Sequence, residues 1–236
     1  MPRNLHYVNY LFDMTIGKKI AFSNDSEHII GGKRLKWIEN VGRTQFIQTG
    51  IAPTDSMKFV MDYEEAETNT TAWGVFFGLS VYDYGKDAIC WRHYALKTSF
   101  SPWFGQLIDA DGADNDGPNG SQMSVFNHEY IPQIVHHVEL SYGLCVYDGQ
   151  SCTINSSHIG TNPLRTVRLF GCNNYKQTGD HRSREFKCHR FTVYDSDTII
   201  LNLVPSMIDD GEVCMYDLVT KSFFLNSGTG TFDYSE

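Results

Sequence analysis

Residues 201–232 decide the fold of this chain, and they read LNLVPSMIDDGEVCMYDLVTKSFFLNSGTGTF. Leu201 and Leu203 alternate with Asn202 and Val204, which predicts a strand with one buried face. We expect Pro205 to end that strand, because proline has no N–H to donate to a neighbouring strand. The same alternation from residue 213 to 218 predicts a second strand.

Turn residues separate these strands. The Asp-Asp-Gly sequence at 209–211 and the polar residues 219–222 predict two tight turns, with a third strand at 223–225. Residues 226–231 form a glycine-rich exit, and we expect Phe232 to pack it back onto the body. The stretch therefore predicts a β-meander that closes an all-β domain.

The same stretch resembles the closing segment of laminin-G-like, concanavalin A-like jelly-roll domains, which recur in phage structural proteins and bacterial surface proteins. Three further blocks resemble the family in the same order: residues 37–51 (WIENVGRTQFIQTGI), 76–78 (FFG) and 161–174 (TNPLRTVRLFGCNN). Together the blocks cover about residues 35–233. The resemblance implies an antiparallel β-sandwich with jelly-roll topology. It implies no single function, because this fold serves lectins, hydrolases and inert spacers.

The rest of the chain also has a strand pattern. Residues 59–63 and 134–140 alternate apolar with polar, and residues 72–81 are nearly all apolar, as in a central strand. Asp148-Gly149 between two short apolar runs predicts a hairpin with a type I′ turn. Because no segment has a helical period, two packed antiparallel sheets are the expected architecture.

Length, composition and charge exclude several classes of protein. The 236 residues can bury a large core, and 14% of them are aromatic, which suits strands. A formal charge of −9 argues against nonspecific binding to nucleic acid. No apolar run approaches the ~20 residues of a membrane-spanning helix.

The first 34 residues match no block of the family and are too apolar for a disordered linker. We therefore divide the chain into an N-terminal arm or anchor, residues 1–34, and a jelly-roll domain, residues 35–236, with a hinge at Gly31-Gly32. The arm either docks on a neighbouring subunit or adds a strand to the domain's own sheet. Residues 1–7 do not resemble a secretory signal, which favours a virion protein made in the host cytoplasm. The alternative is an extracellular or cell-surface protein whose signal was removed in cloning.

The six cysteines form no C-x-x-C pair, so the sequence predicts no zinc site. We expect mostly buried thiols, as in a protein folded in cytoplasm. Cys145 and Cys152 are placed to face each other across the predicted hairpin.

An acidic, glycine-rich loop at residues 109–120 is the strongest chemical feature of the sequence. Carboxylate oxygens are the ligands that calcium prefers. Many domains of the laminin-G-like family that this chain resembles bind calcium through loop carboxylates at the rim of the ligand site. The candidate calcium ligands are Asp109, Asp111, Asp114 and Asp116. The spacing is not that of an EF-hand, and the alternative is a solvated acidic loop.

The family resemblance also implies a rim of loops that contacts a glycan. Aromatic rings stack on sugar rings, and amide groups hydrogen-bond to their hydroxyls. The candidate carbohydrate-binding residues are Trp103, Tyr84, Asn173 and Asn174. For Trp73 and Trp91 we expect places in the core.

Two adjacent histidines, His136 and His137, must point to opposite faces of a strand and so cannot share a metal. We expect His136 to be a hydrogen-bonded core residue. The nearest approach to a hydrolase pattern is Asp62 with Glu64, but the spacing lacks the family's order of catalytic acids. No catalytic metal, phosphate loop or serine triad is recognisable, so we predict a protein that is not an enzyme.

These features together predict a non-enzymatic phage virion protein, a tail-fibre, head-fibre or decoration component, that displays a carbohydrate-binding-type domain for attachment to the host. Its arm would bind other virion proteins, its domain a host-surface glycan, and the protein would be a homo-oligomer. The alternatives are a structural module without a ligand, a glycan-cleaving enzyme and a bacterial surface adhesin.

Overall fold

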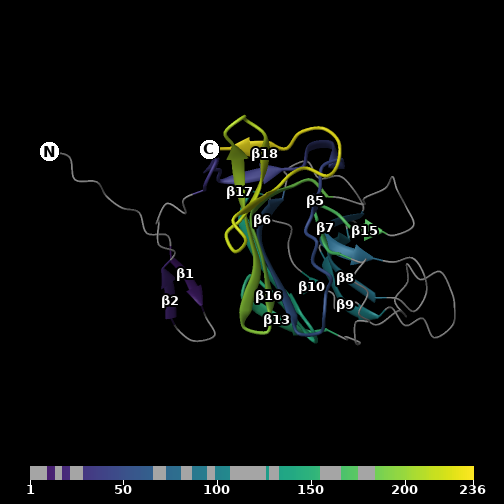
Figure 1. The fold of residues 1–236 in the computed structure, drawn as a ribbon. Coiled ribbons are helices and arrows are strands. Elements are labelled where there is room, and N and C mark those ends of the chain that lie inside the picture. Colours follow the sequence, from purple (N-terminus) through teal and green to yellow (C-terminus); the bar gives the residue numbers. More distant parts are fainter. Residues whose placement is uncertain are drawn as a thin grey trace.

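The protein is an all-β sandwich in which two large sheets face each other (Figure 1). The computed structural model describes residues 10–13, 18–21, 29–65, 73–80, 87–94, 99–106, 126–127, 133–154, 166–174 and 184–236. All described strand pairs are antiparallel except one, between β15 (Asn173–Asn174) and β7 (Trp73–Ser80). The expected all-β antiparallel sandwich is thus confirmed. Within the described ranges, no helix is long and apolar enough to cross a membrane.

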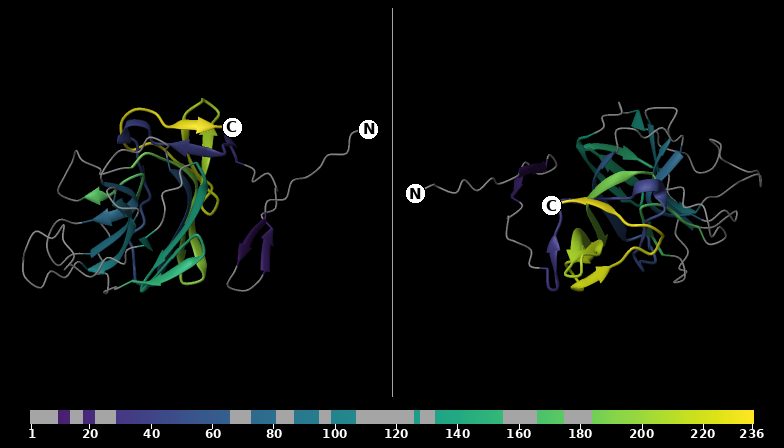
Figure 2. Two further views of the ribbon diagram at one scale, coloured as in Figure 1. Left: turned by 180° about the vertical axis from the view of Figure 1, so that it is seen from behind. Right: turned by 90° about the horizontal axis from the view of Figure 1, so that it is seen from above.

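The larger sheet has eleven strands. Its main path runs in the order β13 (Gln150–Thr153), β12 (Leu144–Tyr147), β11 (Val135–Ser141), β6 (Met57–Glu65), β16 (Phe186–Asp195), β17 (Thr198–Ile208), β18 (Val213–Asp217) and β19 (Ser222–Phe224). Three short strands from the chain's two ends complete it: β3 (Gly32–Arg34), β4 (Trp37–Glu39) and β20 (Asp233–Ser235). Figure 2 shows the C-terminal strand β20 beside β4, its partner, at one end of the sandwich.

The smaller sheet has seven strands. They are β10 (Phe126–Asn127), β9 (Ser99–Gln106), β8 (Asp87–Tyr94), β7 (Trp73–Ser80), β14 (Arg168–Leu169), β5 (Ile47–Gln48) and β15 (Asn173–Asn174). A separate two-stranded sheet pairs β1 (Tyr10–Asp13) with β2 (Lys18–Ala21), and a short 3-10 turn spans Val41–Arg43.

Strand β6 shows why the two sheets pack. Along it, buried and half-buried residues alternate without exception. Phe59 and Tyr63 lie on the buried side and meet the smaller sheet at Phe77 and Phe76, with ring centroids 5.9 Å and 4.6 Å apart. The opposite side of β6 faces away from this core, so its polar residues form an outer face of the sandwich.

A buried ion pair lies at one end of β6. Glu65 accepts from Arg184 Nε at 2.8 Å and lies 2.7 Å from its Nη2, and both side chains are 1% exposed. Burial raises the pKa of Glu65, and the guanidinium opposes that shift. On the facing strand β7, a Cβ at Gly74 would lie 2.5 Å from the Cβ of Arg184. Glycine at this position therefore makes room for the cation between the sheets.

The closing stretch folds around one buried carboxylate, Asp217. Its Oδ1 accepts from the backbone N–H groups of Asn202 and Val219, at 2.8 and 3.1 Å. Its Oδ2 accepts from both the backbone N–H and the hydroxyl of Thr220, at 3.0 and 2.7 Å. This one side chain therefore binds the turn after β18 to strand β17.

Phe232 packs the glycine-rich exit back onto the core, as predicted. It is 4% exposed, and its ring lies 5.0 Å from that of Phe170. Earlier in the exit, a Cβ at Gly228 would lie 1.9 Å from the carbonyl oxygen of Thr44, so no other residue fits there without a backbone shift.

The prediction that Pro205 ends its strand is wrong, because β17 continues to Ile208. Pro205 lies where β17 changes partner on one side: pairing with β16 stops at Leu203, and pairing with β3 starts at Ser206. The carbonyl of Pro205 accepts from Leu35 N at 2.9 Å. Pro205, which has no N–H, therefore lies between the end of β16 pairing and the start of β3 pairing. At this position β17 needs no backbone N–H donor on that side.

The predicted hairpin at Asp148-Gly149 is confirmed. Both residues have positive φ, 45° and 79°, as a type I′ turn requires, and Cys145 pairs with Cys152 in the register. The five cysteines whose side chains the structure describes are all buried, Cys145 among them.

The segment before residue 35 contributes to the sandwich. Ile29 is buried in a small apolar cluster with Val204 and Tyr216, and β3 pairs with β17 through Arg34 and Ser206. Residues of the proposed arm from Gly32 onward thus lie in the larger sheet, as one of the two alternatives expected.

The four bonds to Asp217 generate a prediction about stability. Replacing Asp217 by Ala leaves three backbone N–H groups without their acceptor, and we expect a loss of about 3 kcal/mol in the free energy of unfolding. Urea denaturation measures it. Asp210→Ala is the matched control, because exposed Asp210 accepts a single turn bond from Glu212 N, and its loss should stay within about 0.5 kcal/mol. Equal effects of the two changes would contradict this role of Asp217.

Candidate functional site

A row of charged side chains crosses the outer face of the larger sheet. We call it the outer-face row; its members are Glu39 of β4, Lys58, Asp62 and Glu64 of β6, His137 and Glu139 of β11, and Lys187, His189 and Arg190 of β16. The members on β6 and β11 occupy the half-buried positions that alternate with core residues. Because neighbouring strands keep the same faces in register, the outward positions of several strands form one continuous surface.

A β-bulge in β16 adds to the row. The register between β16 and β6 shifts between Cys188 and Arg190, so His189 is an extra residue. Cys188 and Phe191 on either side are fully buried, whereas His189 and Arg190 are both half-buried. The bulge therefore presents two consecutive side chains on the outer face, where a regular strand would present one.

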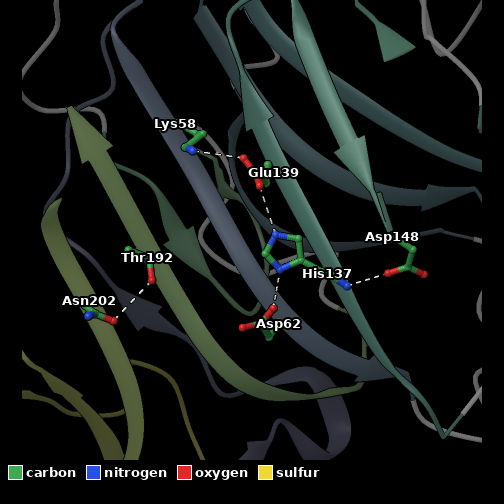
Figure 3. Close-up of polar contacts among 7 residues, drawn as sticks. All are labelled: Lys58, Asp62, His137, Glu139, Asp148, Thr192 and Asn202. Carbon is green, nitrogen blue, oxygen red and sulfur yellow. Dashed lines mark hydrogen bonds and ion pairs between the residues drawn. The ribbon is translucent and has the colours of Figure 1, made fainter. Parts of the chain in front are cut away.

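His137 is the centre of the row, between two carboxylates (Figure 3). Its Nδ1 lies 2.6 Å from Asp62 Oδ1, and its Nε2 lies 3.4 Å from Glu139 Oε1. Lys58 Nζ donates to the other oxygen of Glu139 at 3.1 Å. A short chain of alternating charges thus joins β11 to β6.

Each charged group in this row of contacts stabilises the charged form of its neighbour. Burial alone would lower the pKa of His137, but the hydrogen bonds to Asp62 and Glu139 outweigh it and raise the pKa to about 9. The hydrogen bond from His137, with help from Lys58, lowers the pKa of Glu139 to about 2 against the effect of burial. Both groups therefore keep their charge throughout the neutral pH range.

A second charge cluster lies further along the sheet. Lys187 Nζ lies 2.7 Å from Glu64 Oε1 and 4.9 Å from the ring centre of Trp37. His189 Nε2 lies 3.8 Å from the other oxygen of Glu64, and burial lowers the pKa of His189, so this imidazole is neutral at pH 7.

Aromatic rings flank the row at two places. Trp37 lies beside Lys187, and the ring of Tyr194 lies 4.7 Å from Lys58 Nζ. Lys187 and Tyr194 are on the same strand, β16, seven residues apart. The β4–β16 register places Trp37 one residue beyond the Ile38–Cys188 pair, about five residues from Tyr194 along β16, so at about 3.3 Å per residue roughly 15 Å separates the two aromatic positions.

On the other face of β11, His136 behaves as predicted. It is 2% exposed, and its Nδ1 lies 2.7 Å from Asp148 Oδ2 and 2.8 Å from Tyr147 OH. The two adjacent histidines thus occupy opposite faces, and His136 is a hydrogen-bonded core residue. Trp91 is also in the core, fully buried, with its indole N–H 3.4 Å from Tyr63 OH.

The residues predicted from the sequence to bind a ligand belong to other parts of the chain. Trp103 lies within strand β9, where it pairs with Cys90, and Asn173 and Asn174 form β15, beside the end of β7. Their side chains are outside the described part of the structure, as are Tyr84 and the whole acidic loop with Asp109, Asp111, Asp114 and Asp116. Among the residues that the structure does describe, no three of the types His, Cys, Asp or Glu are arranged to hold a metal ion.

Comparison with protein-family models finds no match to this chain, and comparison with curated proteins finds none either. The geometry of the outer-face row is therefore the main guide to function. Its side chains carry both signs of charge, and His137 and Glu139 at its centre keep their charge near neutral pH. Such a surface offers fixed hydrogen-bond donors and acceptors, which suits recognition of a polar ligand.

The raised pKa of His137 predicts a pH-dependent contribution to stability. Its folded-state pKa of about 9 exceeds the ordinary 6.5, so the stabilisation is fully present below pH 6.5 and is lost as the pH rises through 9. We expect an NMR titration of the imidazole to give a pKa near 9, falling towards the ordinary value in Asp62→Asn. The stability difference between the two proteins should shrink from pH 6.5 to pH 9.5. An imidazole that titrates at or below 6.5 in the wild type would contradict the proposed ion pairs.

Proposed function

We propose that this protein is a non-enzymatic carbohydrate-binding β-sandwich of a phage virion, displayed for attachment to a host-surface glycan. The observation that carries the proposal is the outer-face row. It combines fixed polar groups with two aromatic rings on one sheet face, which is the chemistry that recognises sugars: hydroxyls bond to the polar groups, and apolar faces of the rings contact the aromatics.

The pairing of the carboxylates favours binding over hydrolysis. Glycoside hydrolases need one carboxyl group that gives up a proton and a second that acts as a nucleophile or base. Asp62 and Glu139 both contact His137, and Glu64 contacts Lys187. Carboxylates held by cations are poor proton donors but remain good hydrogen-bond acceptors.

The virion role and the jelly-roll topology rest on the ordered sequence blocks that resemble domains of phage structural and bacterial surface proteins. Two of these blocks meet in space: Thr44 Oγ1 donates to the Thr229 carbonyl at 2.8 Å, and Phe46 N to Asn226 Oδ1 at 3.2 Å. In this proposal the part of the N-terminal arm that precedes Ile29 binds other virion proteins, and the protein is a homo-oligomer. Calcium at Asp109, Asp111, Asp114 and Asp116, and a glycan contact at Trp103, Tyr84, Asn173 and Asn174, are parts of the same proposal.

The test is binding of the purified full chain to host cells and to a glycan array, with calcium and with a chelator. We expect glycan binding in at least one condition. Loss of binding in chelator supports the calcium loop, and unchanged binding removes calcium from the proposal while the carbohydrate-binding function stands. If no glycan and no cell surface binds in either condition, the protein is a structural module without such a ligand.

One observation favours a second candidate, a glycan-cleaving enzyme. Glu39 and Glu64 are the register partners of Lys187 on its two sides, so they lie two strands apart, roughly 10 Å between Cα atoms. Burial raises the pKa of Glu39, although Lys187 opposes it. Inverting glycosidases place their carboxyl groups at about 6.5–9.5 Å, with one acid of raised pKa.

Release of reducing ends from bound glycans separates the two candidates. We expect no release by the wild-type protein. Cleavage by the wild type that disappears in Glu39→Gln and persists in Glu212→Gln, an exposed glutamate of the turn before β18, would replace the binding function by an enzymatic one.

A further inference from the structure

We infer that the outer-face row binds an uncharged oligosaccharide laid along β6 and β16, with Asp62 and Arg190 hydrogen-bonding neighbouring hydroxyls of one sugar unit. The inference rests on the proposed carbohydrate-binding function and names its ligand class and its central contact.

The charge of the row selects the ligand class. The four carboxylates of the row are Glu39, Asp62, Glu64 and Glu139, and the four cations are Lys58, His137, Lys187 and Arg190. The neutral imidazole of His189 adds nothing, so the row as a whole has no net charge. The anionic groups of a sialylated or sulfated glycan would contact carboxylates of the row as well as its cations. Those groups would lose their hydration without a net electrostatic attraction to replace it. A neutral sugar, whose hydroxyls both donate and accept, can bond to either sign.

The centre of the row has hydrogen-bonding capacity left over. Asp62 uses Oδ1 for His137, and within the described residues its Oδ2 has no hydrogen bond. Arg190 uses Nε to donate to Asn202 Oδ1 at 2.9 Å, and its two terminal nitrogens have no hydrogen bond to any residue that the structure describes, which leaves them for a ligand. The two residues are direct register partners across β6 and β16, so their Cβ atoms lie about 5 Å apart.

This pairing suits two adjacent hydroxyl groups. The carboxylate oxygen accepts from one hydroxyl, and the guanidinium donates to the oxygen of the other. The contacts that hold each side chain on its protein partner, His137 for Asp62 and Asn202 for Arg190, also reduce the entropy lost on binding.

The two aromatic positions set the length of the ligand. Tyr194 lies towards one end of the row and Trp37 towards the other, and the Asp62–Arg190 pair lies between them. A single sugar cannot contact all three positions over roughly 15 Å, whereas an oligosaccharide extended along β16 can. Affinity should therefore increase with the number of sugar units.

The experiment uses the full chain and neutral oligomers of glucose, mannose and N-acetylglucosamine, two to six units long, with heparin and polysialic acid as anionic probes. Calorimetry should show binding of at least one neutral series, tighter for longer oligomers, and none of the anionic probes. Asp62→Asn and Arg190→Gln should each raise the Kd at least tenfold. Asp197→Asn and Lys221→Gln are exposed matched controls away from the row and should stay within twofold.

The outcomes are separable. Preference for anionic probes overturns the ligand class, and neutral binding that both variants leave unchanged overturns the site, while the proposed carbohydrate-binding function survives in both cases. Absence of binding to every neutral and anionic glycan removes the proposed function and this inference together. Because a variant can fail to fold, the His137 imidazole resonances of the wild type provide a second measurement: they should shift when a neutral oligomer binds, and an unchanged spectrum at saturation would contradict the inference.

Discussion

The alternation of strand β6 is the constraint on which the rest of the structure depends. Its inward side chains, such as Phe59 and Tyr63, are fully buried against the smaller sheet, and each contributes about 1.5–3 kcal/mol by leaving water. A slip of one residue would bury Lys58 and Asp62 in their place, which the core cannot tolerate. The packing of the aromatic core therefore fixes the register that assembles the outer-face row.

Charged side chains are stabilised in different ways on the two faces of the larger sheet. On the inner side, Glu65 and Arg184 are almost inaccessible, and the pair depends on direct contact and on the space that Gly74 leaves. On the outer side, the ion pair of Asp62 with His137 keeps 21% and 29% of its side chains exposed, so both can still meet a ligand. Removing one partner of the inner pair would leave a buried charge, whereas the outer pair can exchange contacts with water.

Much of the architecture could be predicted from local patterns. The hairpin at Asp148-Gly149, the opposite faces of His136 and His137 and the packing of Phe232 all follow from alternation or turn chemistry within a few residues. The interruption expected at Pro205 did not occur, because the effect of a missing N–H depends on which strand lies opposite. The identity of the opposite strand depends on residues distant in the sequence, so the local sequence pattern around Pro205 cannot predict it.

The sequence by itself determined the all-β class, since a period of two residues with frequent turn signals predicts short strands that pack as antiparallel sheets. It also identified Asp62 and Glu64 as alternating acids, but it did not identify the residues that they contact. Only the tertiary structure decided that β11 and β16 flank β6 and that a bulge turns His189 outward beside Arg190. The physical reason is that strand order and register come from packing across the whole core, so residues more than a hundred positions apart become neighbours with no trace in the sequence near them.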